Sequence, residues 1–83
     1  MKEKNATTYQ ELITSLQERT YSSLEIKRIR LKCYLIIHFA TYSRTLINKF
    51  GKRKEYRHIW QILDWLKVNF DIEKDQLKFP NND

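Results

Sequence analysis

Apolar residues recur at helical spacing near the start of the chain. Thr8 and Glu11 fit a capping box, in which the Thr hydroxyl and the Glu carboxylate accept from each other's backbone N–H groups. Apolar positions follow at the i, i+3, i+4 and i+7 spacing of one helix face: Tyr9, Leu12, Ile13 and Leu16. The spacing predicts a helix over residues 9–19, whose apolar face must be buried by other elements.

A second capping box, from Ser22 to Glu25, predicts that another helix begins at about residue 23. No glycine or proline follows until Gly51, which comes directly after Lys49 and Phe50. A glycine at that place fits the left-handed residue that ends many helices. The predicted helix spans residues 23–50 and is roughly 42 Å long at 1.5 Å per residue.

Read at 100° per residue, this long segment shows two apolar stripes on nearly opposite sides. One stripe consists of Leu24, Leu31, Leu35, Phe39, Tyr42 and Leu46. The other consists of Ile26, Ile29, Cys33, Ile36, Ile37, Ala40 and Ile47. A helix that is apolar on two sides is covered on both. We therefore expect the first stripe to be a partner interface, occupied by a second copy of the chain or by another helical protein.

A third helix is predicted over residues 55–70. Its apolar stripe consists of Tyr56, Ile59, Leu63, Leu66 and Phe70. Trp60 and Trp65 lie off the centre of this stripe, and we include them in the partner interface because Trp is enriched in binding hot spots. The expected fold is all-α, with a short, a long and a short helix in one domain of residues 1–83, in which residues 1–7 and 79–83 are flexible.

The order of these predicted helices, with a basic loop after the long one, resembles the layout of the histone fold. The similarity extends from Tyr9 to Phe70, and the stretch Gly51 to Lys54 looks like the basic loop of that fold. The resemblance implies a helical dimer that contacts DNA. This chain has Glu55 where many histone-fold sequences have Thr, and it lacks their Asp early in the last helix.

Positive charge is concentrated in the middle of the chain. The 83 residues have a net charge of +6, and residues 23–58 contain ten Lys and Arg residues against Glu25 and Glu55. Such a region suits nucleic acid, an anionic membrane surface or an acidic protein. The candidate nucleic-acid-binding residues, with one Tyr for base stacking, are Lys27, Arg28, Arg30, Lys32, Lys49, Lys52, Arg53, Lys54, Tyr56 and Arg57.

No pattern indicates a catalytic or metal centre. Cys33, His38 and His58 lack the paired spacing of a zinc site, and no glycine-rich phosphate loop is present. Arg53 and His58 match the loose R-x4-H spacing of HEPN ribonucleases, which implies an alternative in which His58 assists RNA cleavage. We read His38 as a partly buried structural residue. The expectation is a protein that is not an enzyme and needs no cofactor.

The sequence contains neither a signal-peptide pattern nor an apolar run long enough to span a bilayer. Its single cysteine excludes an internal disulfide and favours an intracellular setting, cytoplasmic or nuclear. Nucleic-acid binding through residues 49–57 and the start of the long helix is the leading hypothesis. The main alternative is a protein-interaction module, such as a small regulator, that uses the partner interface; attachment to anionic membranes is a third.

Overall fold

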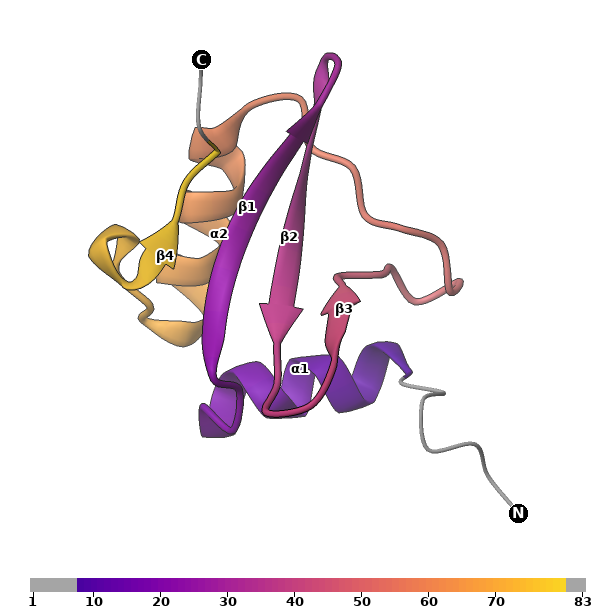
Figure 1. Cartoon of the computed structure of the whole chain (residues 1–83), viewed down its shortest axis with the longest axis vertical. Coiled ribbons are helices and arrows are strands. Elements are labelled where there is room, and N and C mark those ends of the chain that lie inside the picture. The colour runs from indigo at the N-terminus through magenta and orange to yellow at the C-terminus, as the bar shows by residue number, and fades with distance from the viewer. Residues whose placement is uncertain (1–7, 81–83) are drawn as a thin grey trace.

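The described residues fold into two α-helices, a short 3-10 helix and a four-stranded sheet, and Figure 1 shows how these elements are arranged in the computed structural model. The structure describes residues 8–80. Along the chain its elements are α1 (Tyr9–Glu18), β1 (Ser23–Ile29), β2 (Lys32–His38), β3 (Ser43–Thr45), α2 (Ile59–Phe70), the 3-10 helix η1 (Lys74–Gln76) and β4 (Leu77–Lys78). The all-α expectation is therefore wrong, and the fold is α+β.

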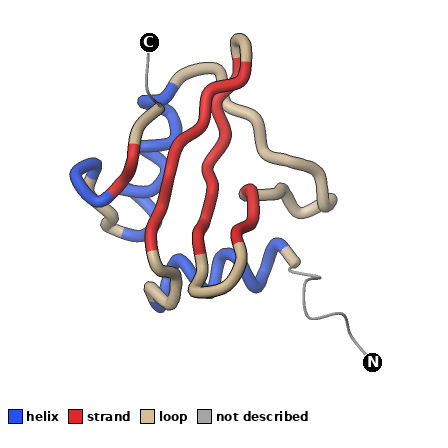
Figure 2. The backbone as a smooth tube through the Cα atoms, viewed as in Figure 1, coloured by secondary structure: helices blue, strands red, loops and turns tan. Residues whose placement is uncertain are grey.

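The predicted long helix does not exist, because residues 23–50 form a β-meander followed by the start of a loop (Figure 2). Leu24 and Ile26 alternate with more exposed residues in β1, and Cys33, Leu35 and Ile37 alternate with other residues in β2. This period of two places one side of each strand in the core. The two apolar stripes are thus not opposite faces of a helix, and the layout resemblance to the histone fold fails with them.

The sheet is mixed, with the strand order β3-β2-β1-β4. β1 and β2 pair antiparallel, from Ser23 opposite His38 to Ile29 opposite Lys32. β3 pairs antiparallel with β2, and the short β4 pairs parallel with β1. The connection between β1 and β2 is only Arg30 and Leu31, a two-residue turn that contains none of the usual turn residues.

Both helices contribute to one core on one face of the sheet. α1 supplies Leu12 and Leu16, and α2 supplies Ile62 and Leu66. These side chains share a cluster with the buried strand residues Leu24, Ile26, Cys33, Leu35 and Ile37, and with Leu46, Ile72 and Leu77. In the view of Figure 1, α2 lies behind the sheet and α1 crosses the end at which β1 begins. Alternation leaves Glu25, Lys27 and Tyr34 on the opposite face.

The first predicted helix is confirmed, and the third is confirmed with a later start. The capping box of α1 forms, because Thr8 Oγ1 accepts from Glu11 N (3.1 Å) and Glu11 Oε1 accepts from Thr8 N (2.9 Å). α2 begins at Ile59 rather than at residue 55, because Tyr56 is held in a β-bridge with Cys33. Residues 1–7 and 81–83, most of the segments predicted to be flexible, lie outside the described residues.

Gly51 has the predicted positive φ, 85°, but it ends no helix. It lies in a loop that is organised by Asn48. The Asn48 side-chain oxygen accepts from the backbone N–H groups of Phe50 (2.8 Å) and Lys52 (3.1 Å), and its carbonyl accepts from Gly51 N (2.9 Å). A tight turn thus accounts for the glycine.

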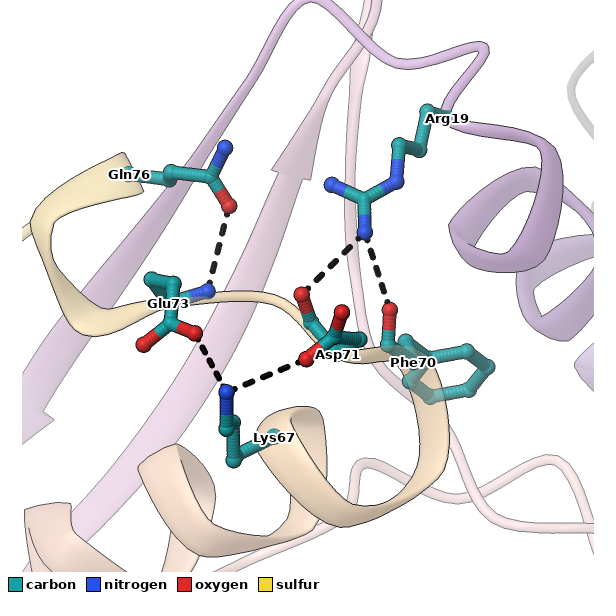
Figure 3. Close-up of polar contacts among 6 residues, drawn as sticks. All are labelled: Arg19, Lys67, Phe70, Asp71, Glu73 and Gln76. Atoms are coloured by element: carbon teal, nitrogen blue, oxygen red, sulfur yellow. Dashed lines mark hydrogen bonds and ion pairs between the residues drawn. The ribbon is translucent and has the colours of Figure 1, made fainter.

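A polar junction ties the end of α1 to the end of α2 (Figure 3). Arg19 Nη2 donates to the carbonyl oxygens of Phe70 (3.0 Å) and Asp71 (3.2 Å). Lys67 donates to Asp71 Oδ1 (3.0 Å) and to the Glu73 carboxylate. The hydrogen bond that Lys67 donates to Glu73, followed by the one it donates to Asp71, raises the pKa of Lys67. The junction, defined here as residues 19, 67, 70, 71 and 73, thus satisfies the last carbonyls of α2 within the chain.

Candidate nucleic-acid interface

The tip of the β1–β2 hairpin presents both cations and apolar side chains to solvent. Arg30 occupies the first turn position with a φ of 59°, in the left-handed region that residues with a Cβ rarely adopt. Leu31 is 86% exposed and Ile29 is 48% exposed. Arg28 lies on the same strand face as the core residues Leu24 and Ile26 but beyond the core, where it is exposed.

The segment before α2 runs beside this hairpin. Cys33 and Tyr56 form a β-bridge, with Cys33 N donating to Tyr56 O (2.7 Å) and Tyr56 N to Cys33 O (2.9 Å). The bridge brings Arg57 and His58 close to the hairpin tip, residues 28–32, which lies 25 to 30 positions earlier in the chain. Together the two segments surround a hollow of about 660 Å³, the hairpin hollow, lined by Arg28, Arg30, Leu31, Lys32, Glu55, Tyr56, Arg57 and His58.

Most of the charge in the hairpin hollow is unneutralised. Lys32 Nζ forms an ion pair with Glu55 Oε1 at 2.8 Å, and Tyr34 donates to the other carboxylate oxygen at 3.3 Å. The hydrogen bond from Lys32 lowers the pKa of Glu55, and the same bond raises the pKa of Lys32. Within residues 8–80, Arg28, Arg30 and Arg57 form no ion pair. Glu55 is the only acidic residue that lines the hollow.

The first turn of α2 borders the hairpin hollow. Gln61 Oε1 accepts from the backbone N–H groups of Arg57 (3.0 Å) and His58 (2.9 Å), which fixes the entry into the helix. Trp60 is 62% exposed, and its ring lies nearly parallel to that of His58, with an interplanar angle of 12° and ring centroids 6.1 Å apart. His58 therefore lines the hollow and also contacts an exposed aromatic face.

The remaining predicted nucleic-acid-binding residues do not join the hairpin hollow. Lys49 and Lys54 line a second hollow, of about 350 Å³, together with Phe50 and Trp65. Arg53 lies on the open face of the sheet, with its guanidinium 5.0 Å from the centroid of the Tyr34 ring. Lys27 lines a groove on that same face. The basic residues predicted as one patch are thus divided over three parts of the surface, while Lys52 is exposed on the loop.

Tyr56, predicted to stack on a base, is partly buried and packs against the core. Burial raises the pKa of its hydroxyl to about 12. The more exposed aromatic side chain next to the hairpin hollow is Trp60, which the sequence suggested only as a protein-interface residue. Its position beside the hollow follows from the Cys33–Tyr56 bridge, which no local sequence signal indicates.

The predicted partner interface is dispersed as well. Leu24, Leu35 and Leu46 are buried in the chain's own core, and Phe39 and Trp65 pack partly against it. Phe39 and Tyr42 stack on each other in the β2–β3 connection, with centroids 4.8 Å apart. Of this set, Leu31 and Trp60 are the most exposed. The predicted long-helix stripe does not exist as a surface, because its residues belong to strands and their connections.

His38, predicted to be structural, links the three adjacent strands on the open sheet face. Its Nε2 lies 2.8 Å from Glu25 Oε1, and its Nδ1 lies 2.6 Å from Ser43 Oγ. These three side chains satisfy one another between paired strands. The other histidine, His58, lines the hairpin hollow, whereas Arg53 of the R-x4-H spacing faces Tyr34.

In the described part of the chain, no group of three or more His, Cys, Asp or Glu residues could hold a metal ion. No helix within residues 8–80 is long and apolar enough to cross a membrane. Comparison with protein-family models, with curated proteins and with solved structures found no match to this chain.

Proposed function

We propose that this chain is a non-enzymatic protein that binds nucleic acid through the hairpin hollow. The observation that supports the proposal most strongly is the convergence of Arg28, Arg30, Lys32 and Arg57 around one hollow that contains a single acidic side chain. Guanidinium groups suit phosphates because they offer several donors in a planar fork. The unneutralised arginines keep that capacity, because the described residues provide no carboxylate for them.

The backbone next to the hollow supports an anion as well. The hollow includes His58, which directly precedes the N-terminus of α2 at Ile59. A helix N-terminus has a partial positive charge and unsatisfied N–H groups, which favour a phosphate nearby. Cys33 is a buried free thiol, which fits the reducing intracellular setting in which nucleic acids occur.

The test of this proposal is to neutralise the hollow. The variant Arg28→Gln, Arg30→Gln, Lys32→Gln, Arg57→Gln should lose most of its affinity for labelled nucleic acid. Fluorescence anisotropy at about 50 and 200 mM salt should also show a shallower salt dependence, by roughly 0.7 to 0.9 in the log-log slope for each lost phosphate contact. Loss of these contacts should weaken binding to all nucleic-acid sequences alike, because phosphates contain no base information.

A matched control removes the same charge elsewhere. The variant Lys49→Gln, Lys52→Gln, Lys54→Gln, Lys74→Gln has an equal net charge but an intact hairpin hollow. It should keep the larger part of the affinity. Equal losses in the two variants would mean that net charge alone causes binding, and unchanged binding in the hollow variant would reject the proposal.

A protein partner is the second candidate, favoured by the exposure of Leu31 and Trp60 on the same part of the surface. An apolar anchor of this kind binds by burial, and its contribution depends little on salt. A complex that persists at high salt and is lost in Leu31→Ser, with no affinity for nucleic acid at low salt, would identify this function instead.

A further inference from the structure

Trp60 and Trp65 occupy the same helix but have different surroundings. Trp65 packs partly against the core, and its ring meets that of Phe70 edge to face, with centroids 5.1 Å apart. Trp60 lies in the first turn of α2 and is 62% exposed. The core of the described residues does not include Trp60, so the fold itself does not account for a large aromatic side chain at this position.

His58 connects this exposed ring to the hairpin hollow. It lines the hollow beside Arg28 and Arg57, and its ring lies nearly parallel to the Trp60 ring. A phosphate held in the hollow would thus lie one side chain away from an aromatic face. Alternating phosphate and base contacts of this kind are the arrangement by which proteins bind a flexible strand.

We propose that Trp60 is a stacking platform for an unpaired base, so that the ligand of the hairpin hollow is single-stranded nucleic acid. This inference rests on the function proposed above, because the phosphates next to the stacked base occupy the hollow. A base in a duplex has both faces covered by its neighbours and cannot reach Trp60 without being unstacked. Single-stranded DNA or RNA offers its bases without that cost.

The affinity test uses Trp60→Leu, which removes the aromatic face but keeps an apolar residue of good helix propensity. Its affinity for a single strand of about ten nucleotides should fall by roughly 5- to 150-fold, the range for loss of one stacked base. Trp60→Phe should recover most of that affinity. Anisotropy with the whole chain measures both, and circular dichroism checks that each variant is folded.

The matched ligand is an abasic oligonucleotide of the same length, which has the phosphates but no bases. Trp60→Leu should bind it as well as the unchanged chain does, because the hollow is intact. A Trp60→Leu variant that binds the single strand with unchanged affinity would overturn the stacking inference while leaving phosphate binding in place. Failure of the unchanged chain to bind any of these polyanions would instead overturn the proposed function.

Fluorescence gives a second, independent measurement. The chain has two tryptophans, so Trp65→Phe leaves Trp60 as the only one. A stacked base should quench Trp60 emission, whereas a duplex of the same sequence should bind more weakly and quench little. Equal affinity and equal quenching with the duplex would contradict the inference. A blue shift on vesicles of anionic lipid, without quenching by oligonucleotides, would indicate insertion into a membrane interface and would also overturn it.

Discussion

Arg19 and Arg30 have nearly the same φ angle, but their guanidinium groups have different surroundings. Their φ angles are 55° and 59°, in the left-handed region that residues with a Cβ rarely adopt. In the junction, Arg19 donates to the carbonyl oxygens of Phe70 and Asp71. At the hairpin tip, Arg30 has no hydrogen bond or ion pair through its side chain with another residue in the range 8–80.

The same contrast holds for the neighbouring cations. Lys67 of the junction pairs with both Asp71 and Glu73, whereas only Lys32 of the hairpin hollow has a carboxylate partner. Cations that are saturated by acceptors stabilise the fold and have little capacity left for a ligand. Cations without acceptors contribute little to stability and remain available to phosphates. The junction is therefore a structural site, whereas the cations of the hairpin hollow remain available for the ligand that we propose.

The largest effect expected from this comparison is on stability. Arg19→Ala should reduce the free energy of unfolding by about 1–2 kcal/mol, because two charge-assisted hydrogen bonds to the end of α2 are lost from an exposed site. Arg30→Ala should change it by less than about 0.5 kcal/mol, as surface substitutions usually do. Urea unfolding followed by circular dichroism measures both. A loss of stability in Arg30→Ala as large as that in Arg19→Ala would mean that Arg30 also stabilises the fold.

A smaller effect is expected when glycine replaces each arginine. At Arg30, glycine removes roughly 1–2 kcal/mol of left-handed backbone strain from the folded state. Its greater freedom in the unfolded chain costs roughly 0.5–1 kcal/mol on folding, so the free energy of unfolding should rise by about 0.5–1 kcal/mol. At Arg19 the same gain is outweighed by the lost hydrogen bonds, and stability should fall by about 0.5–1 kcal/mol.

Urea unfolding should therefore show changes of opposite sign in the free energy of unfolding of the two glycine variants. Arg30→Gly should also bind single-stranded nucleic acid more weakly than the unchanged chain, even though it is more stable. Arg19→Gly should bind it with unchanged affinity. If Arg30→Gly lost both stability and binding, the weaker binding would reflect a damaged fold, and Arg30 would belong to the structural group with Arg19.

The junction and the hairpin also differ in how far the sequence predicts them. α1 was predicted correctly because its capping box and its apolar spacing are local signals. The hairpin was not, because its turn residues Arg30 and Leu31 lack the glycine or asparagine that marks most two-residue turns. The sequence separations between buried strand residues such as Leu24 and Leu35 also fit one stripe of a helix, so spacing alone favoured the helical period over the strand period of two.

The candidate site was predictable in composition but not in arrangement. The sequence identified Arg28, Arg30, Lys32 and Arg57 as candidate phosphate ligands, and all four line the hairpin hollow. What joins them is the Cys33–Tyr56 bridge, a pairing between residues 23 positions apart that has no local signal. The same bridge brings Glu55 beside Lys32, so an acidic residue of the site became visible only in the structure.

The smallest effect expected concerns Glu55, the acidic residue of the hairpin hollow. Glu55→Gln removes a charge that repels phosphate and releases Lys32 from its ion pair. Affinity for single-stranded nucleic acid should rise by about 2- to 5-fold at low salt, the size expected for one exposed charge a few ångströms from the ligand. The gain should shrink at high salt, because screening weakens interactions between exposed charges. Asp71→Asn, which removes one negative charge from the junction, is the control and should leave affinity unchanged.

The pH dependence of binding gives a second test of the role of Glu55. The ordinary pKa of a glutamate is 4.5, and the hydrogen bond from Lys32 lowers the pKa of Glu55 below that value. The Glu55 carboxylate therefore stays ionised as the pH falls to 4.5. Protonation below that value removes the repulsion, so the affinity of the unchanged chain should then approach that of Glu55→Gln. Comparing the two chains at each pH cancels the contributions of other titrating groups. If the difference disappeared well above pH 4.5, Lys32 would not be holding Glu55 in its ionised form, and the hollow would already have a free lysine for the ligand.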